Sequence, residues 1–506
     1  MLLEMCVALF CGCGLTADSV GTPLWREFVD ARAAGRESVL PDFSYAGYKF
    51  SEQPLPDVAA RPRFVVTNYG ARPNDADYDD EGIQAAIDAA SAAGGGVVYF
   101  PAGRFLIAAD QDASKHIRIA HSNVVLKGSG AGDDGTEIFQ KERRIGARQF
   151  VFQPMRQRSE RLTTIVRGAA REQHWVDVAD SSPLRVGQNV VIRHRSESFT
   201  RQYFDPLPLA PEWARLIGPG RGMEIHEIHT IAEIDGTRVR FVNPLHFDLV
   251  IQSEAPFRLE SYPTIAECGV EDIRFTGHWD SYPEDFVHHK DAIHDSGWCA
   301  LAMEYVEDAW IRSCEFRNYN ECVLMRGAYK ATVENVAFTG KRGHTSVHAR
   351  TGYGVLIKHC TFSAGHHHGP GNGYGAVGTV VSRCTMEVDQ NIDCHSGQPF
   401  ATLFDDVDGG VFSNLGGPWE GLPHHGKHLV LWNFRHRSSR DFHYNFWDVA
   451  RRRNHTIARP ILVGFQADTK ITFQNEGVSE SPGAAVEPRS LFEAQLVLRL
   501  QKPVKK

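Results

Sequence analysis

The chain has 506 residues, of which 42% are hydrophobic and 23% charged, and its formal net charge is −8. This acidic balance argues against a general nucleic-acid binder, so we expect no nucleic-acid partner. The length exceeds the limit of about 250–300 residues for one compact core, which leaves several domains or a solenoid that grows along one axis.

The first 18 residues, MLLEMCVALFCGCGLTAD, contain a short apolar core followed by small residues. We interpret residues 1–18 as a signal peptide, although they begin without Lys or Arg and carry Glu4. We therefore expect a secreted or periplasmic protein, and Gly12-Cys13 offers an attachment point for a lipoprotein anchor. No other stretch is long and apolar enough for a membrane span. Residues 19–60, rich in proline and aromatic residues, are predicted to form an irregular arm laid on the body.

A strand–helix–strand unit is predicted next. Phe64–Val66 has the composition of a strand, and an apolar helical face follows, made by Ile83, Ala86, Ile87 and Ala90. Gly94–Gly96 end that helix, and Val97–Phe100 is a buried strand before a Pro-Ala-Gly turn. A helix beside the first strand would cover the unpaired edge of a solenoid. We place the start of the solenoid and its capping helix at residues 61–154.

The run NYGA…DD…IQAAIDAA…GGGVVYFPAGRF resembles the N-terminal signature of the pectate-lyase-like superfamily of right-handed parallel β-helices. The opening PDFSYAGYKF and the ending VEPRSLFEAQLVLRL resemble a bacterial branch of that superfamily, mostly of uncharacterised carbohydrate-active proteins. The resemblance implies the fold and a carbohydrate-active protein. It does not identify a substrate.

Residues 155–262 lack the period that marks the later coils. Their segments TTIVRGA, WVDVAD and GQNVVIRH alternate as antiparallel strands do. We predict a β-rich insertion that packs beside the solenoid and walls one end of its groove.

A repeat of 22–24 residues indicates the solenoid itself. Four segments end on a large apolar residue at intervals of 22, 24 and 24 residues: Phe316, Phe338, Phe362 and Met386. A smaller residue stands two positions before each one: Cys314, Val336, Cys360 and Cys384. Alternate residues of a strand point the same way, so stacked segments would form two inward ladders. This pattern predicts one strand of a parallel β-solenoid per repeat, with the three cysteines as free core thiols.

Other segments extend the same column. VEDIRF, which ends at Phe275, resumes the solenoid, and Phe412 and Phe434 are predicted to continue it. We assign residues 263–435 to the main coils with the active-site groove and 436–506 to a strand-rich C-terminal cap. The predicted fold is all-β, a right-handed parallel β-helix with an N-terminal helical cap and a β-rich insertion.

Polar residues with catalytic potential follow three consecutive ladder positions. These turns carry Lys341, Arg342 and His344, then His366, His367 and His368, then Gln390, Asn391, Asp393 and His395. His344 and His368 both stand six residues beyond their ladder positions, so we expect them to stack one coil apart. One histidine-rich turn is often only a solvated loop, but three successive turns favour a functional site.

A cationic, titratable strip suits β-elimination on a uronic acid. The C5 proton lies α to a carboxylate, so a lyase must neutralise that carboxylate, place a base and supply an acid. We assign Arg342 or Lys341 to bind the carboxylate, with help from Asn391. The base is His344 or His368, because imidazole titrates near neutral pH. Asp393 would orient a histidine, and His395 would be the acid. The remaining predicted substrate contacts are His366, His367 and Arg326. We therefore predict a monomeric polysaccharide lyase acting on an acidic, uronate-containing polysaccharide.

Two other functions remain open. Asp389, Asp393 and either Asp405 or Asp408 could supply the paired carboxyls of a glycoside hydrolase. Tryptophans could instead stack on sugars in a non-catalytic glycan-binding solenoid: Trp419, Trp432 and Trp447. The surplus of His and Arg favours the lyase.

No cofactor is certain from the sequence. Histidine pairs and Asp393-x-His395 could ligate a transition metal, and the resemblance brings in a divalent cation such as calcium, which many β-helix lyases use. The acidic run Asp405, Asp406 and Asp408 is interpreted as a solvated turn rather than a calcium site.

Overall fold

The computed structural model describes residues 21–109, 112, 115–252, 255–413, 415–450 and 455–501. Residues 1–18, interpreted as a signal peptide, lie outside the described residues. Among the helices that are described, none has both the length and the apolar character needed to cross a membrane.

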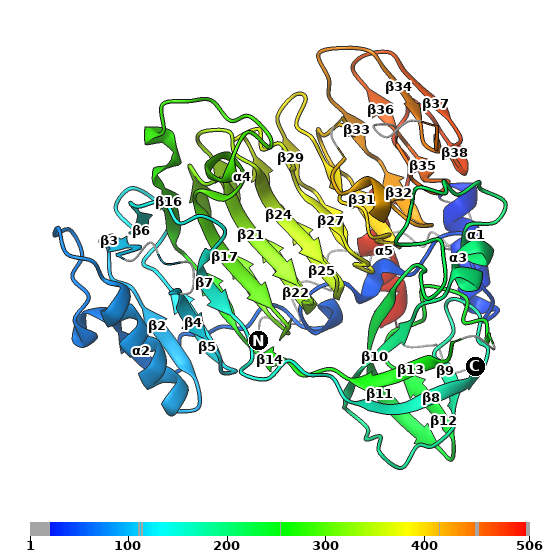
Figure 1. The fold of residues 1–506 in the computed structure, drawn as a ribbon, viewed down its shortest axis with the longest axis horizontal. Helices are drawn as coiled ribbons and strands as arrows, with labels where there is room; N and C mark the ends of the chain where they lie inside the picture. Colours follow the sequence, from blue (N-terminus) through cyan, green and yellow to red (C-terminus); the bar gives the residue numbers. More distant parts are fainter. Residues whose placement is uncertain are drawn as a thin grey trace, which may run out of the picture.

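Three parallel sheets wind into a solenoid (Figure 1). Sheet A contains β1 (Arg63–Val65), β2 (Gly96–Tyr99), β5 (Val124–Lys127), β15 (Gly269–Glu271), β19 (Trp310–Arg312), β22 (Tyr329–Glu334), β25 (Tyr353–Lys358), β28 (Val380–Ser382), β31 (Thr402–Asp405), β32 (Leu429–Trp432), β35 (Ile461–Val463) and β38 (Val478–Glu480), with β14 (Ile265–Ala266) and β18 (Val306–Glu307) at its side. Sheet B contains β3 (Gly103–Ile107), β6 (Thr136–Gln140), β16 (Arg274–Gly277), β20 (Glu315–Arg317), β23 (Ala337–Thr339), β26 (Thr361–Phe362) and β29 (Thr385–Met386). Sheet C contains β4 (Ile117–Ile119), β7 (Arg148–Phe152), β17 (Cys299–Glu304), β21 (Glu321–Arg326), β24 (Thr345–Arg350), β27 (Gly371–Gly373) and β30 (Asp393–Cys394).

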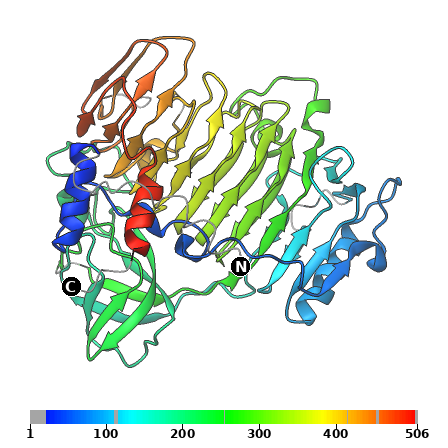
Figure 2. The same ribbon diagram turned by 180° about the vertical axis from the view of Figure 1, so that it is seen from behind.

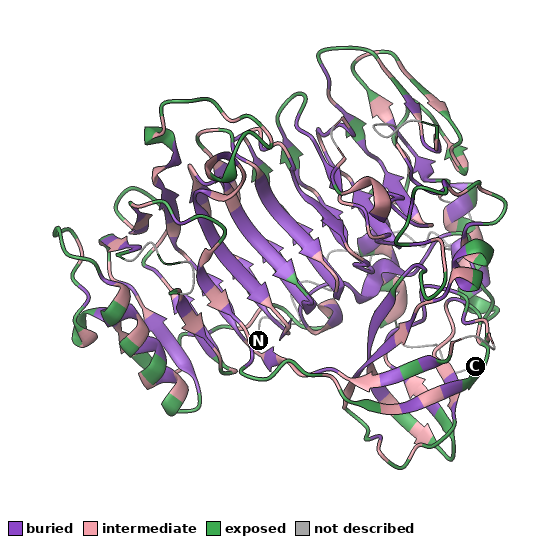
Figure 3. Ribbon diagram, in the orientation of Figure 1, coloured by how far each residue is buried: buried purple, intermediate pink, exposed green. Residues whose placement is uncertain are grey.

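The predicted inward ladder is confirmed. Phe316 pairs with Phe338, Phe338 with Phe362, and Phe362 with Met386 on adjacent strands of sheet B. The phenylalanine rings lie nearly parallel, with centroids 5.6 and 4.9 Å apart. The ladder of smaller residues is buried as well, and its three cysteines are free: Cys314, Cys360 and Cys384. Figure 3 shows the same burial along the strands of the middle coils.

The predicted continuation of the column is wrong. Asp408 pairs with both Thr385 and Arg435, so Gly409 takes the ladder position beside Met386, and His436 takes the one after it. Phe434 falls in the column of smaller residues, and Phe412 lies past the strand. Gly409 has no side chain to fill the interior, and these two rings fill it instead, with centroids 6.5 Å apart.

The corner between sheets A and B has a left-handed residue in each middle coil. The four positions have φ between 51° and 53°: Ser313, Asn335, His359 and Arg383. A non-glycine residue in this region costs roughly 1–2 kcal/mol, because its Cβ crowds the carbonyl oxygen. Each corner residue stands directly before a ladder residue, Cys314, Val336, Cys360 or Cys384, and the sheet B strand follows.

His359 offers a test of that strain. Its ring is exposed and lies 3.7 Å from Glu334, so little packing is lost when it is replaced. We expect His359→Gly to stabilise the fold by about 0.5–1 kcal/mol and His359→Val to destabilise it by about 1–2 kcal/mol, measured by urea unfolding. As a control, His121→Gly, at an exposed position without positive φ, should bring no gain. Equal effects of glycine at the two positions would contradict the account.

The predicted helical cap and insertion are both present. Helix α2 (Asp80–Ala92) covers the first coil and buries the predicted face of Ile83, Ala86, Ile87 and Ala90. The insertion is a closed antiparallel barrel of β8 (Arg161–Arg167), β9 (Trp175–Val178), β10 (Asn189–His194), β11 (Ile225–Asp235), β12 (Arg238–Phe241) and β13 (Phe257–Ser261), with α3 (Glu197–Phe204) after β10. The barrel contacts the solenoid at the corner between sheets C and A. The Tyr262 hydroxyl, just after β13, donates there to the carbonyl of Gly327, which lies between β21 and β22, at 2.6 Å.

Both ends of the described chain are more regular than predicted. The arm begins with helix α1 (Pro23–Ala33), which Thr22 caps and whose first residue is proline. The coils continue past the predicted boundary at residue 435, because β35 and β38 extend sheet A in parallel. Short parallel pairs flank them, β33 (Arg435–His436) with β36 (Gln466–Ala467) and β34 (Phe442–Asn445) with β37 (Ile471–Gln474).

Helix α5 (Leu491–Leu500), where a strand-rich cap was predicted, closes the C-terminal region. Its Gln495 accepts from the amide of Phe43 and donates to the carbonyl of Pro41, at 2.9 and 2.8 Å. The arm and α5 therefore lie side by side on the solenoid (Figure 2). The two segments that resemble the bacterial branch, one near each end of the sequence, meet in space.

Asp405 ties α5 to sheet A and makes stability depend on pH. Its buried carboxyl accepts from Ser382, Ser490 and the amide of Leu491, yet burial outweighs these bonds and raises its pKa to about 7. A raised folded-state pKa means that the stability contributed by protonated Asp405 is complete below the unfolded pKa near 3.9 and is lost as the pH rises through about 7.

We expect the stability of the wild type relative to Asp405→Asn to fall by up to about 4 kcal/mol between pH 4 and pH 8, because asparagine does not ionise. Urea unfolding of both proteins across this range measures it. A difference that does not change with pH would contradict the prediction.

Candidate active site

Two glycines of strand β27 make room for the site. The register of sheet C places Gly371 between His348 on β24 and Asp393 on β30. A Cβ at Gly371 would lie 2.2 Å from the Asp393 carbonyl oxygen, and one at Gly373 would lie 2.8 Å from the Cβ of His395. Because β27 lacks these side chains, those of β24 and β30 meet across it.

Asp393 is the centre of the site. Its Oδ2 lies 2.8 Å from Nδ1 of His395, 3.3 Å from Nδ1 of His368 and 3.4 Å from Nε2 of His348. Its Oδ1 accepts the amide of Gly416 at 2.8 Å. Burial alone would raise the pKa of Asp393, but the three histidines outweigh it and hold the pKa well below its usual range. The carboxylate is thus ionised at neutral pH and orients the imidazoles around it.

The expected stacking of two histidines on adjacent coils is confirmed. The rings of His344 and His368 have centroids 5.1 Å apart, and the amide of His368 donates to the carbonyl of His344 at 2.7 Å. Burial would lower the pKa of His344, but Glu321 and the backbone carbonyl of Asp295 outweigh it, and the pKa is raised. His344 therefore favours the protonated state more than a free histidine does.

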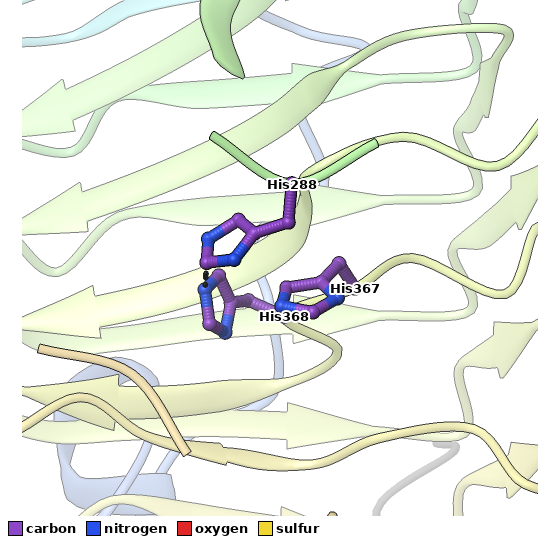
Figure 4. Close-up of side chains that lie close together, drawn as sticks. All are labelled: His288, His367 and His368. Atoms are coloured by element: carbon purple, nitrogen blue, oxygen red, sulfur yellow. Dashed lines mark hydrogen bonds between the residues drawn. The ribbon is translucent and has the colours of Figure 1, made fainter. Parts of the chain in front are cut away.

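His288 joins the cluster from a segment without the repeat. It belongs to the excursion, residues 278–296 between β16 and β17, which carries α4 (Ala292–Ser296). Its Nε2 lies 3.3 Å from Nε2 of His368, and its ring centroid lies 4.0 Å from that of His367 (Figure 4). Burial and neighbouring imidazoles lower the pKa of His288 to about 3 and that of His367 to about 2, so both are neutral at pH 7.

Three predicted site residues have other roles. His366 is buried, with Nε2 3.1 Å from the carbonyl of Tyr319, and does not reach the cluster. Lys341 donates to the carbonyls of Tyr282 and Glu284, both at 2.7 Å, so it anchors the excursion. Asn391 donates to the carbonyl of His367 at 2.8 Å and accepts from the amide of Ser413 at 3.0 Å, and so braces the loops. Their polar atoms are used within the protein, which corrects the roles assigned from the sequence.

Basic and aromatic side chains adjoin His395. Arg350 stands next to Arg326 in the register of sheet C, and its guanidinium lies 5.3 Å from the ring centroid of Tyr374. The Tyr374 ring is 5.8 Å from that of His395. Arg326 pairs with Glu304 at 3.5 Å, and Arg342 lies at the rim, 3.5 Å from Nδ1 of His367. Arg350 and Tyr374 were missed because they stand at the end of sheet C, not after a ladder position.

The carboxyls proposed to pair with Asp393 are engaged elsewhere. Asp389 accepts from the hydroxyls of Ser438 and Ser439, Asp405 lies under α5, and Asp408 pairs with Arg437. The tryptophans divide in a similar way. Trp432 and Trp447 are buried, whereas Trp419 lines a cavity of about 660 Å³. His288, His289, His367 and His368 line the same cavity.

Comparisons with known proteins match two stretches of the chain. The family described as rhamnogalacturonase A/epimerase, pectate lyase-like, matches residues 64–165, and a domain of unknown function, DUF4955, matches residues 365–505. Mannuronan C5-epimerase AlgE3 of Azotobacter vinelandii is 44% identical over 70 residues, which are 14% of this chain and 4% of that protein. Alginate lyase 7 of the same organism is 43% identical over 70 residues, 14% of this chain and 8% of that protein. The chain thus matches only a small part of the length of these relatives.

Solved structures also match the chain, at low identity and with TM-scores below 0.5. The tailspike protein gp49 from Pseudomonas phage LKA1 has a TM-score of 0.47 and 13% identity, covering 84% of this chain and 79% of that one. The A-module of Azotobacter vinelandii mannuronan C-5 epimerase AlgE4 has a TM-score of 0.32 and 13% identity, covering 84% of this chain and 96% of that one. The helix-capped coil at residues 64–165 thus matches a pectate-lyase-like family model, and the three parallel sheets form the parallel β-helix that this resemblance implies.

Proposed function

We propose that the chain is a polysaccharide lyase that cleaves a uronate-containing polysaccharide by β-elimination. The observation that carries the proposal is the 2.8 Å contact between Nδ1 of His395 and the buried carboxylate of Asp393. A carboxylate only accepts, so Nδ1 of His395 carries the proton and Nε2 keeps a lone pair. An imidazole fixed in this tautomer is suited to remove a proton from C5.

His395 therefore takes the role of base, in place of the acid role assigned to it from the sequence. His344 is less suited, because its Nδ1 lies 2.7 Å from the carbonyl of Asp295 and its Nε2 is buried without a partner. His368 is less suited as well, because its Nε2 faces His288 rather than open space. Of the three histidines around Asp393, His395 alone lies at normal hydrogen-bond distance, 2.8 Å, whereas His368 and His348 are 3.3 and 3.4 Å away.

Arg350 is suited to the substrate carboxylate. A guanidinium presents two parallel N–H donors to a carboxylate, and neutralising it lets charge develop there as the C5 proton leaves. Arg326 stands on the neighbouring strand β21, and adjacent strands are about 4.8 Å apart. It would contact the next sugar. Lys341 is excluded from this role by its two backbone carbonyls.

Tyr374 completes the proposed reaction. The C5 proton passes to Nε2 of His395, the C4–O bond breaks as the C4–C5 double bond forms, and the departing oxygen takes a proton from the Tyr374 phenol. The ring of Tyr374 lies 5.3 Å from the guanidinium of Arg350 and 5.8 Å from the ring of His395, near both proposed groups. Two relatives named a mannuronan C5-epimerase and an alginate lyase lend support, since the first name specifies C5 and the second elimination.

A panel of uronate-containing and neutral polysaccharides, incubated with and without a chelator, tests the proposal. We expect unsaturated, ultraviolet-absorbing chain ends from at least one uronate polymer and from no neutral one. New reducing ends without unsaturation would show hydrolysis instead. Binding without any change in chain length would show a glycan-binding solenoid, and either result would refute the lyase.

A further inference from the structure

We propose that His288, His367 and His368 form a binding site for one divalent transition-metal ion, with Zn²⁺ the best match. The three side chains lie close together with ligand nitrogens within 4.8 Å of one another (Figure 4). They come from two separate segments, the excursion and the turn between β26 and β27. This site goes beyond the proposed lyase reaction, which uses none of the three.

The spacing of two of the nitrogens already fits a metal. Zn²⁺ binds imidazole nitrogen at about 2.0–2.1 Å in a tetrahedral arrangement, which sets two ligand nitrogens about 3.3–3.4 Å apart. Nε2 of His288 and Nε2 of His368 are 3.3 Å apart. The His367 ring is stacked on that of His288, with centroids 4.0 Å apart, so His367 would have to turn toward the other two nitrogens to complete the site.

Asp393 stands behind His368 at this site. Its Oδ2 lies 3.3 Å from Nδ1 of His368, while Nε2 of the same ring faces Nε2 of His288 at 3.3 Å. A carboxylate behind a ligating histidine is the usual outer support of a metal site. The backbone of the pair is held too, by bonds from the amides of His367 and His368 to the carbonyls of Gly343 and His344 at 3.0 and 2.7 Å.

The neighbouring group of His348, Asp393 and His395 is the competing metal site. Its shortest contact, 2.8 Å between Asp393 and His395, is a hydrogen-bond distance and is shorter than the separation of two ligands on a tetrahedral ion. A proton between these two atoms explains the distance, whereas a metal would push them apart. The three-histidine group is therefore the better site.

The fourth coordination position would open on the 660 Å³ cavity that all three histidines line. Three protein ligands and one open position are typical of reactive zinc sites rather than structural ones. If the proposed lyase reaction is correct, a sugar carboxylate is the ligand suited to that position. Arg342 opposes metal binding, because its guanidinium lies 3.5 Å from Nδ1 of His367 and repels a cation.

The test uses the full chain stripped of metal with a chelator and titrated with Zn²⁺ or Co²⁺ alone. We expect one ion per chain by calorimetry and, for Co²⁺, the visible absorption of a four-coordinate nitrogen site. His288→Ala should weaken binding by more than the roughly 10–100-fold expected for Asp393→Asn, which removes the outer support. Arg342→Gln should tighten it.

His289→Ala is the matched control. His289 directly follows His288 in the excursion and lines the same cavity. Its Nδ1, however, is paired with Asp295 at 2.9 Å. This variant and His348→Ala should bind Zn²⁺ as the wild type does. Circular dichroism and thermal melts confirm that each variant is folded, and His288 lies outside the solenoid core.

Two results would overturn the site. One is wild-type affinity in folded His288→Ala, and the other is loss of binding in His348→Ala with retention in His288→Ala. Because metal binding is measured without substrate, its failure leaves the lyase proposal standing. Conversely, a protein that binds metal at this site but forms no unsaturated product from any uronate polymer refutes the lyase alone.

Discussion

Replacing His395 by alanine is expected to lower kcat on the true substrate by about 10²–10⁴-fold, the usual contribution of a positioned base. KM should change little, because Arg350 and Arg326 remain to hold the carboxylates. Added imidazole should restore part of the rate if the missing group acts as a base. The rate of unsaturated-product formation measures all three effects.

Two further variants separate catalysis from folding. Asp393→Asn should also lose activity, since an amide no longer fixes the Nδ1–H tautomer of His395 by charge. His359→Ala removes an exposed histidine at the corner between sheets A and B and should leave activity unchanged. Near-normal activity in folded His395→Ala would contradict the role of His395.

Replacing Phe338 by alanine is expected to have the largest effect on stability. The ring is fully buried and stacks between Phe316 and Phe362, with centroids 5.6 and 4.9 Å away. A buried Phe→Ala change costs about 3–5 kcal/mol through lost transfer energy and the cavity left behind. Loss of two ring contacts places this site at the upper end of that range.

Phe338→Leu provides the matched control, because it keeps most of the apolar volume and should cost less than half as much as alanine. Urea unfolding gives both values. Each coil of a solenoid contacts mainly its neighbours, so hydrogen exchange should speed up most in β20, β23 and β26. A loss below about 1 kcal/mol in Phe338→Ala would show that this stack is not a core of the solenoid.

The sequence predicts the middle of the solenoid well because its period is regular there. The spacing of Phe316, Phe338 and Phe362 gives the register of sheet B directly. The period fails after Met386, where Gly409 takes the ladder position and rings from outside it fill the core. No local pattern shows which distant ring fills a gap left by a glycine.

The candidate site was only partly accessible to the same reasoning. Counting from the ladder placed His344 over His368 and located the turn of Asp393. It could not find His288, whose excursion lies outside the repeat, or Arg350, which reaches the site from the strand rather than the turn. It also could not separate His366, whose side chain is buried against Tyr319, from its neighbour His367.

The glycines of β27 link the fold to the chemistry. Gly371 and Gly373 could be read from the sequence as turn residues, but the register shows them as the strand between His348 and Asp393. Side chains there would separate the carboxylate from its imidazoles. The site depends on the absence of side chains at these two positions as much as on the residues around them.

The fate of the C5 hydrogen tests the central claim most directly. A uronate polymer that the protein shortens would be digested in D₂O and its products examined by NMR. We expect loss of the C5 hydrogen only in residues that carry a new C4–C5 double bond. Chain shortening with every C5 hydrogen retained would contradict proton abstraction by His395, and deuterium at C5 in saturated, uncut chains would contradict the elimination step.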